Sequence, residues 1–388
     1  MNTYAPVFIV EIDGKELSED ISSHIENFSY EDHDEKMDQL CIRIADADLS
    51  FVEHPQLQEG KEIRARWGYL GNLSEMRICT VKEIKYDFGQ DGLLRINITA
   101  FDKGHKLTGR SARTCWKDKK VKDIVEDIAK KHNLKPVVDI PEDLPREFVS
   151  EGGKNDMIFL QELAQDTGCV VWVQNDELHF EPNKMTDPVM KFRYREDRDG
   201  YLQNFSITLK AEDGKGMGGE TEVAGVDPLS KKEIKETTNA KDEGVAVPLG
   251  DKRKENETPL QAKDDETGRV VPSPAPTQTQ AKQEGAGKVA TSAMKAIEAT
   301  AKMIGLPTLK AKESVTIENI GKKFSGNWRI KKVKHQIAKG GYMCDLTFVK
   351  SDIEGGSKSG AAGKTPGSST PAGESKNTAP PFVEENLK

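Results

Sequence analysis

Apolar and polar residues alternate through most of the first hundred positions of the chain. Runs such as 40–44 ("LCIRI"), 63–69 ("IRARWGY") and 94–100 ("LRINITA") repeat this alternation with period two. A strand with this pattern has one apolar and one polar face, which is typical of a sheet with one side buried. The Asp13-Gly14 pair suits the positive φ angles of a tight hairpin turn. About five or six such strands favour a small barrel or sandwich.

The period changes from two to helical spacing after Cys115. The apolar positions of 121–128 recur at helical spacing, and Asn133 stands where a helix C-terminus is expected. A second predicted helix begins after Asn155, a good N-cap residue, and ends at Gly168, which tolerates the left-handed conformation. Strand patterns return directly after it, so a two-helix element is predicted between two β regions.

The composition changes again in the C-terminal third. From 231 to 287 the chain is rich in charged residues and proline and poor in aromatic residues, which predicts a mobile polar insertion. The Ala-rich stretch 288–304 is predicted to be helical, 305–352 is again strand-like, and 353–388 is predicted to be a flexible tail.

The stretch "WRIKKVKHQI" mixes basic and large apolar residues and could be read as a nucleic-acid surface, as a metal or catalytic site around His335, or as a strand. A β-bulge at Lys331-Lys332 would shift the register by one residue and bring its large residues onto one face. That face would consist of Trp328, Ile330, Val333, His335 and Ile337. The strand interpretation is favoured, with His335 as a packed wall residue and Lys331, Lys332 and Lys334 on the outer face.

Charge and cysteine content exclude several classes of protein. The net charge of −8, from 65 acidic and 57 basic residues, provides no global cationic field for a polyanion. The five cysteines are scattered without a CxxC pair, which argues against a disulfide framework or a zinc cage and suits a reducing cytoplasm. The first residues do not resemble a signal peptide, and no segment approaches the roughly 20 apolar residues that a membrane span needs.

Motifs that would carry catalysis or cofactor binding are missing. The sequence has no GxxxxGKS/T loop, GxSxG elbow or HExxH pair, and its seven histidines show no ligand-like spacing. The acidic stretch 31–35 ("EDHDE") could bind a cation, but a solvated strand connection is favoured because it lacks the glycine of a calcium loop. No metal, cofactor or catalytic residue is therefore predicted, although a pair of carboxylates as in a glycosidase is neither shown nor excluded.

Three segments in order resemble one known family. They are "SYEDHDEKMDQLCIRIADADLSF", "KNDMIFLQELAQDTGCVVWVQNDELHF" and "LPTLKAKESVTIENIGKKFSGNWRIKKVKHQI". Together the chain resembles the late control protein D family, the baseplate hub proteins of contractile-tailed phages, and is similar to the hub part of VgrG proteins. Lys312 stands where that family often has glycine.

The resemblance implies a structural protein rather than an enzyme. It implies a mainly β (α+β) fold with two similar antiparallel β-barrel, tube-like domains plus a small helical domain. It also implies a homotrimer that adapts the sixfold tail tube to the threefold central spike, because a sixfold ring cannot bind a threefold partner uniformly without an adaptor. The implied partners are the tail tube protein, the central spike protein and other baseplate proteins, without membrane or specific nucleic acid. The implied location is the virion tail baseplate, or that of a related particle, with synthesis and assembly in the bacterial host cytoplasm.

Residue patterns and resemblance together predict seven segments. They are a first barrel at 1–112, a helical insert at 113–168, strands of the second barrel at 169–230, a polar insertion at 231–287, a helix at 288–304, strands completing the second barrel at 305–352 and a disordered tail at 353–388. The candidate interface residues are Lys331, Lys332 and Lys334 on the outer sheet face, and Phe382 and Val383 as anchors in the tail.

Two other functions stay open at the level of sequence. A peptidoglycan hydrolase borne on a tail would need a carboxylate pair in a cleft. A single-strand nucleic-acid binder with OB-like barrels would need exposed aromatic residues on a cationic groove, whereas Trp67 and Trp328 alternate like core residues.

Overall fold

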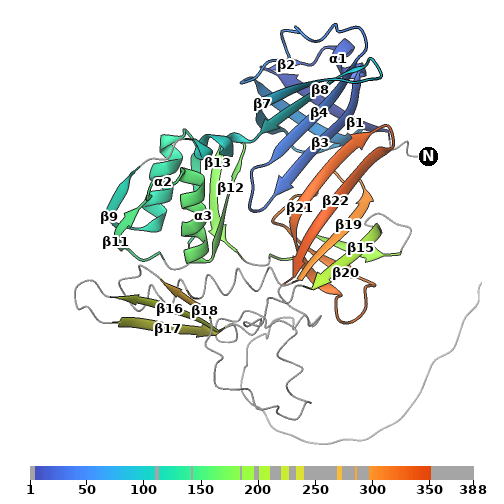
Figure 1. Ribbon diagram of the computed structural model, residues 1–388. Helices are drawn as coiled ribbons and strands as arrows, with labels where there is room; N and C mark the ends of the chain where they lie inside the picture. The colour runs from blue at the N-terminus through green and yellow to red at the C-terminus, as the bar shows by residue number, and fades with distance from the viewer. Residues whose placement is uncertain are drawn as a thin grey trace, which may run out of the picture. The chain divides into compact units, whose positions relative to one another are not determined.

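Strands dominate the computed structural model (Figure 1). It describes residues 5–109, 113–140, 143–183, 186–195, 201–209, 220–226, 233–239, 269–272, 285 and 297–350. The fold is mainly β, contains a β-barrel and has few helices. None of the helices in these ranges has the length and apolar content that a membrane span needs.

Six strands of the first hundred residues form an antiparallel sheet, here called the N-terminal strand group. Its members in spatial order are β1 (Pro6–Ile12), β5 (Glu62–Tyr69), β7 (Arg77–Phe88), β8 (Leu94–Phe101), β4 (Gln39–Asp46) and β3 (Ile25–His33). The short strands β2 (Lys15–Glu16) and β6 (Asn72–Leu73) extend β1 and β5, and α1 (Glu19–Ser23) precedes β3. Asp13 and Gly14 both have positive φ between β1 and β2, so the predicted hairpin turn is confirmed.

The two end strands of this group approach each other through side chains. No ladder joins β1 to β3 among the described residues, but Phe8 of β1 stacks on Phe28 of β3 with ring centroids 5.3 Å apart. The group is thus a strongly curved sheet whose gap is filled by aromatic packing.

Six later strands form a closed ring, here called the C-terminal barrel. They are β14 (Met190–Tyr194), β15 (Tyr201–Leu209), β19 (Ile297–Ile304), β22 (Gly341–Lys350), β21 (Gly326–Ala338) and β20 (Ser314–Glu318), and β20 pairs again with β14. The prediction of an antiparallel barrel is wrong for β14, which runs parallel to both β15 and β20. Only the end of β14 pairs with the start of β15, at Arg193–Tyr201 and Tyr194–Leu202, so the two strands overlap over two residue pairs.

The predicted helix at 288–304 is wrong for its described part. Residues 297–304 form β19, which pairs with β15 on one side and β22 on the other. Ile297, Ala299, Ala301 and Met303 are buried and alternate with more exposed residues. The alanine content favours a helix, but burial between two strands overrides that weak intrinsic preference.

The helical subdomain is a separate packing unit between the two strand groups in the sequence. It contains η1 (Lys103–Thr108), β9 (Cys115–Lys119), α2 (Val121–Lys131), β10 (Lys135–Val138), β11 (Arg146–Ser150), α3 (Asp156–Thr167), β12 (Cys169–Gln174) and β13 (Glu177–Pro182). The predicted caps are confirmed: the Ile158 amide donates to Asn155 Oδ1 at 2.9 Å, and Asn133 and Gly168 have positive φ after their helices.

The boundary of this subdomain differs from the predicted one. β12 and β13, predicted to belong to the second barrel, pair with each other, and β13 also pairs with β10. Their buried residues Val171, Val173, Leu178 and Phe180 share a core with the two helices. The subdomain therefore extends to Pro182, because these strands bury their apolar face against helices rather than inside a barrel.

A separate three-stranded sheet lies in the sequence region predicted as polar insertion and its flank. It contains β17 (Glu233–Asn239), β16 (Glu220–Val226) and β18 (Arg269–Pro272), in that order. The sequences of β17 and β18 contain β-branched residues that favour strands despite the polar surroundings. The rest of 231–287 and all of 353–388 lie outside the described residues.

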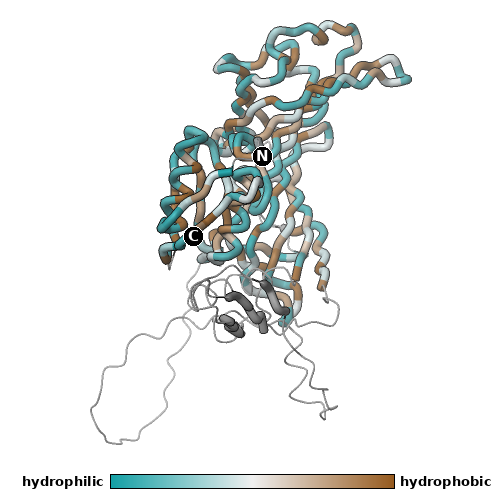
Figure 2. The backbone as a smooth tube through the Cα atoms, turned by 60° about the vertical axis from the view of Figure 1, so that its left-hand side comes forward, coloured by the Kyte–Doolittle hydropathy of each residue, from teal (hydrophilic) through white to brown (hydrophobic). Residues whose placement is uncertain are grey.

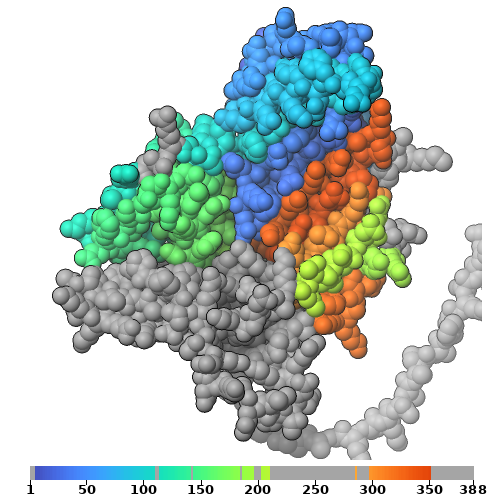
Figure 3. Space-filling view, in the orientation of Figure 1, coloured from blue at the N-terminus to red at the C-terminus, as the bar shows by residue number. Residues whose placement is uncertain are grey.

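One apolar core runs through both strand groups, and the helical subdomain has its own. The alternation of apolar and polar residues along each strand is visible as changing colour along the tube in Figure 2. In the space-filling view, residues of the N-terminal strand group lie directly against those of the C-terminal barrel (Figure 3). The stretch "WRIKKVKHQI" belongs to β21, whose ladder with β3 forms the contact between these two groups.

Candidate functional site

A strand ladder joins the two strand groups. β21 pairs with β3 from Lys332–His33 to Ala338–Asn27. The predicted β-bulge is present, because the register of β21 against β22 shifts between Ile330 and Lys332. Before the bulge β21 pairs with β20, and after it the same edge pairs with β3. The bulge is therefore the point at which β21 leaves its own barrel and joins the N-terminal strand group.

Of the predicted interface lysines, Lys332 and Lys334 lie on the outer face of this ladder, and Lys331 stands at the bulge just before it. Lys332 Nζ is 3.4 Å from Glu31, Lys331 Nζ is 3.9 Å from Glu298, and Lys334 is paired in register with Glu31. Carboxylates thus stand close to these lysines, and partly exposed pairs of this kind are worth only about 0–1 kcal/mol. Their role as a binding surface stays a prediction. Phe382 and Val383 lie outside the described residues.

His335 is a packed wall residue, as predicted. It is 1% exposed, and its ring lies 5.1 Å from Trp67. Nε2 is 3.2 Å from the Leu309 carbonyl and Nδ1 is 2.7 Å from the Tyr342 hydroxyl. Since a carbonyl can only accept, Nε2 carries the proton and Nδ1 accepts from Tyr342. Burial lowers the pKa of His335 to about 4, so the ring is neutral and structural.

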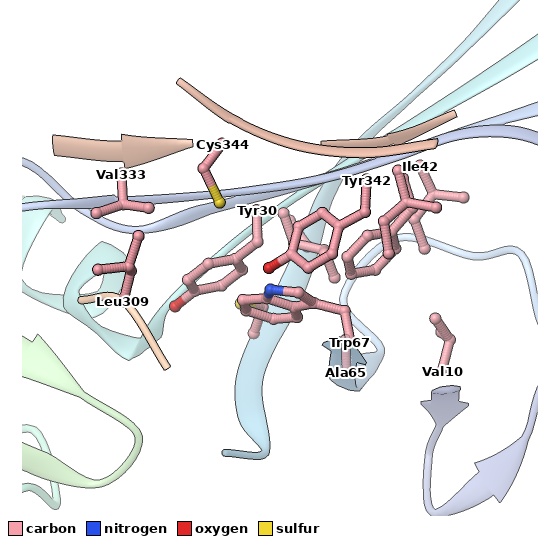
Figure 4. Packing of buried hydrophobic residues seen from close by; sticks show 14 of the residues in the cluster. Val10, Tyr30, Ile42, Ala65, Trp67, Leu309, Val333, Tyr342 and Cys344 are labelled. Carbon is pink, nitrogen blue, oxygen red and sulfur yellow. The ribbon is translucent and has the colours of Figure 1, made fainter. Parts of the chain in front are cut away.

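Aromatic residues from both groups meet around Trp67 on β5. Its ring is 4.6 Å from that of Tyr30 and 5.6 Å from that of Phe28. Figure 4 shows Trp67 beside Tyr30 and Tyr342, which come from β3 and β22 respectively. The side chains that cover Trp67 therefore come from both strand groups, so their packing depends on the contact between the groups.

A set of buried titratable side chains lies beside the aromatic residues and is here called the buried ionic cluster. Its members are Tyr30, Asp32, Asp38, Arg77, Asp102 and Lys312. Lys312 Nζ lies 2.8 Å from Asp32 Oδ1, and the Ala311 amide donates to Asp32 Oδ2 at 3.1 Å. Arg77 lies 3.7 Å from Asp32 on the other side. Because Lys312 belongs to the segment before β20 and Asp32 to β3, this ion pair ties the two strand groups together.

Lys312 contacts all three packing units. Its Nζ lies 5.4 Å from the centre of the Trp172 ring on β12, in the helical subdomain. Its backbone has φ 76°, a conformation that favours glycine and costs a lysine about 1 kcal/mol or more. The buried ion pair accounts for a lysine at this strained position, since glycine would leave Asp32 without this cation.

The remaining carboxyls of the cluster are hydrogen-bonded but have no cation of their own. Asp38 accepts from the Tyr30 hydroxyl at 2.7 Å and from the His33 amide at 3.2 Å. Asp102 accepts from the Asp38 and Gly104 amides at 2.8 and 2.7 Å. Three buried carboxyls thus share two cations, and ionisation of all three is unfavourable.

The pKa shifts follow from this imbalance. Burial, with the nearby charge of Asp32, raises the pKa of Asp38 well above its ordinary value. Burial also raises the pKa of Asp102 to about 7, although two amides favour its ionised form. Burial opposes ionisation of Asp32 too, but Lys312 and Arg77 outweigh it and lower its pKa.

Asp38→Asn tests this imbalance. A carboxyl whose pKa is higher in the folded than in the unfolded protein takes up a proton on folding. The free energy of unfolding therefore falls as the pH rises from the unfolded-state pKa to the folded-state pKa. We expect the stability of Asp38→Asn relative to the parent chain to rise from pH 5 to pH 7, by up to about 1.4 kcal/mol per pH unit. Urea unfolding at both pH values measures this difference.

Asp91→Asn is the matched control for Asp38→Asn. Hydrogen bonding from Arg95 lowers the pKa of the exposed Asp91. The stability of Asp91→Asn relative to the parent chain should therefore not rise between pH 5 and pH 7. If the stabilities of the two variants changed equally with pH, this would contradict the inference that the Asp38 carboxyl has no cation of its own.

The acidic stretch 31–35 is not the solvated connection that the sequence predicts. Asp32, His33 and Asp34 are 3%, 7% and 6% exposed, because β3 continues to His33 and the Asp34 amide donates to the Lys331 carbonyl. Within the described ranges, no group of three or more His, Cys, Asp or Glu side chains could hold a metal ion. Sequence reasoning missed the buried ionic cluster, since Asp32 and Lys312 are 280 positions apart and no local motif connects them.

Comparisons with known proteins give a family and a fold. A family model described as the Alg8 N-terminal domain matches residues 5–339. No curated protein matches the sequence. The fold is similar to that of a tail protein from Neisseria meningitidis MC58, with a TM-score of 0.67, 12% identity, and coverage of 90% of this chain and 98% of that one.

Two further solved structures share the fold. The 43 kDa tail protein of prophage MuSo2 from Shewanella oneidensis has a TM-score of 0.66 and 12% identity, and the alignment covers 90% of this chain and 100% of that one. A component of the E. coli type VI secretion system has a TM-score of 0.56 and 10% identity, with coverage of 89% and 78%.

These comparisons correct the family predicted from sequence. The resemblance to the late control protein D family is wrong as a family assignment, because the model that matches 5–339 is that of the Alg8 N-terminal domain. The three segments that carried the resemblance are strand and helix patterns of the fold, and a fold pattern is shared more widely than a family. The structures of tail proteins are similar in fold, at 12% identity.

Proposed function

The chain belongs to the Alg8 N-terminal domain family, and from its fold we propose a structural rather than a catalytic role. The proposed protein is a homotrimeric hub of a phage tail or related injection machine, which presents six similar faces to a sixfold tube and a threefold end to a spike. Its proposed partners are the tube protein, the spike protein and other baseplate proteins, and its proposed location is the baseplate of a particle assembled in the bacterial cytoplasm. No cofactor, membrane or specific nucleic acid takes part.

The observation that carries this proposal is a repeated strand order. Taken in chain order, the six long strands of the N-terminal strand group correspond to the six of the C-terminal barrel. The correspondence is β1 with β14, β3 with β15, β4 with β19, β5 with β20, β7 with β21 and β8 with β22. Every ladder between neighbours in the first group then has a counterpart in the second. Two unrelated six-strand sheets would not share this order in all five ladders.

Two β-bulges occur at matching places in the repeat. The β7–β8 register shifts between Val81 and Glu83, as the β21–β22 register shifts between Ile330 and Lys332. The β3–β4 register shifts between Ile25 and Asn27, as the β15–β19 register shifts between Leu202 and Asn204. Bulges are specific features of a fold rather than defects, so two matching pairs support a common origin of the halves.

The aligned strands also share residues. Residues 25–29 read "IENFS" and 202–206 read "LQNFS", while 81–86 read "VKEIKY" and 330–335 read "IKKVKH". The groups differ at β14, which is parallel to its neighbours where β1 is antiparallel. The sequence match thus links β3 with β15 and β7 with β21. Of these strands, β3 and β21 form the ladder between the two groups, here called the joining ladder.

The repeat supplies a physical reason for a trimer. Three chains with two similar strand groups each contain six similar units, which is the number that a sixfold tube requires. The fold shared with tail proteins supports the same role. The absence of a predicted catalytic motif agrees with a protein that works through contacts.

Sedimentation of the full chain tests the proposal. We expect a species of three times the chain mass of 43.0 kDa at micromolar concentration. A stable twofold dimer, or a monomer at every concentration, would contradict the proposal that the protein is a trimeric hub. Release of sugar or peptide from peptidoglycan by the purified protein would contradict the non-catalytic role.

A further inference from the structure

Eight strands of the chain form one continuous sheet with two open edges. Its order is β7, β8, β4, β3, β21, β22, β19 and β15. At one end, β5 pairs with β7 only over Arg77–Thr80, so 83–88 has no described partner on that edge. At the other end, β14 pairs with β15 only at Tyr201 and Leu202, so 204–209 is equally open among the described strands.

Unpaired edges of this length are uncommon in natural proteins, because they offer a row of free backbone groups to another chain. Here both edges carry apolar side chains. Phe88 at the end of β7 is 69% exposed and Leu209 at the end of β15 is 48% exposed. Both open edges therefore present hydrogen-bonding groups and apolar surface together.

The repeat provides a template for what covers these edges. β7 corresponds to β21 and β15 corresponds to β3, and β21 already pairs with β3 inside the chain. We propose that β7 of one copy pairs with β15 of a second copy in the same way. This inference rests on the proposed trimer and names the surface through which its chains meet.

The register follows from the aligned bulges. In the joining ladder Val333 opposes Asp32, His335 opposes Tyr30 and Ile337 opposes Phe28. Each residue of β21 has a counterpart in β7, and each residue of β3 has one in β15. Replacing the residues by these counterparts gives the pairs Ile84 with Leu209, Tyr86 with Ile207 and Phe88 with Phe205. All six transferred residues are apolar or aromatic and fall on one face of the ladder.

The burial of side chains in the joining ladder indicates how a second copy would change the exposure of their counterparts. Ile337 and His335 are 6% and 1% exposed in the joining ladder, and Phe28 is fully buried. Of their counterparts in the single chain, Phe88 is exposed, while Tyr86 and Phe205 are half-buried. A second copy would place these side chains in the environment that their counterparts already occupy.

Strand direction agrees with this pairing. Every ladder in the eight-strand sheet is antiparallel, so successive strands alternate in direction from β7 to β15. With eight strands, β7 and β15 run in opposite directions, as an antiparallel ladder between copies requires. The contact is head-to-tail, so it can be repeated around a closed ring.

Cysteine cross-linking tests the register directly. The Asp34 amide donates to the Lys331 carbonyl, which makes Lys332–His33 and every second pair after it non-hydrogen-bonded. Gln336–Ser29 is such a pair, and its transferred counterpart is Asp87–Ser206. Non-hydrogen-bonded pairs have Cα atoms about 4.5 Å apart, within the range that a disulfide spans.

We expect D87C/S206C, in a background with the exposed Cys115 changed to Ser, to form intermolecular disulfides on mild oxidation. The products should extend to a covalent trimer on a non-reducing gel. The control K85C/N204C is four residues out of register, with Cα atoms roughly 13 Å apart, and should form at least about 10-fold less cross-linked product. Equal yields from the two pairs would overturn the proposed register.

A second variant tests the surface without a disulfide. Phe88→Asp replaces an exposed side chain, so the single chain should fold as before. The protein concentration below which the trimer dissociates should rise by about 10-fold or more. Leu70→Asp, at a position that is 90% exposed and lies away from both edges, should leave the trimer unchanged. A trimer by sedimentation that neither cross-links in register nor responds to Phe88→Asp would overturn this ladder but leave the hub intact. A chain that never trimerises would overturn both.

Discussion

Replacing Trp67 by alanine is expected to lower the free energy of unfolding by about 3–5 kcal/mol. Trp67 is 2% exposed and contacts Phe28, Tyr30 and His335, so its removal leaves a cavity beneath the ladder that joins the two strand groups. Residues from both groups line this cavity, and neither group can fill it without moving against the other. Urea unfolding, followed by fluorescence and by circular dichroism, measures the loss.

Phe148→Ala is the matched control for Trp67→Ala. Phe148 lies on β11 of the helical subdomain and is 64% exposed, so its removal should change stability by no more than about 0.5 kcal/mol. If the two variants lost similar amounts of stability, the aromatic residues around Trp67 would not hold the strand groups together.

Lys312→Met is expected to cost about 3–5 kcal/mol near neutral pH, because it leaves the buried Asp32 without its closest cation. The methionine keeps a side chain of similar length beside Trp172 but cannot donate to the carboxylate. The pKa of Asp32 should rise in the variant, so the loss should shrink as the pH falls from 8 to 5 and the carboxyl takes up a proton. Urea unfolding at these two pH values gives both the size and the pH dependence.

Lys310→Met separates the buried ion pair from an exposed one. Lys310 Nζ lies 2.7 Å from Glu75, but the side chains are 30% and 59% exposed. Its removal should cost about 0.5 kcal/mol or less at both pH values. A loss for Lys312→Met as small as this, or independent of pH, would contradict the role assigned to the buried ionic cluster.

Local patterns in the sequence predicted much of the fold because their causes are local. Alternation of apolar residues predicted the strands of the N-terminal group, and Asn155 and Gly168 marked the ends of α3. The parity change in "WRIKKVKHQI" predicted the bulge at Lys331, since only a register shift brings both sets of apolar residues to one face. Each of these features depends on residues within a few positions of one another.

The features that escaped prediction depend on distant contacts. The Ala-rich β19 is a strand only because β15 and β22 enclose it. The ion pair between Asp32 and Lys312 forms across the fold, and no spacing in the sequence indicates it. Two similar strand domains were implied only by the family resemblance. No pattern within the sequence located the repeat, because the "NFS" shared by 27–29 and 204–206 is too short to stand out until strand pairing aligns it.

The central claim is that the two strand groups of one chain occupy equivalent positions in a ring of three chains. Electron cryo-microscopy of the assembled full-length protein tests it most directly. We predict a threefold particle in which the eight-strand sheets join through β7 and β15 into one closed wall with nearly sixfold appearance. A ring in which β7 and β15 stay unpaired, or a twofold particle in which the strand groups occupy different environments, would contradict the account.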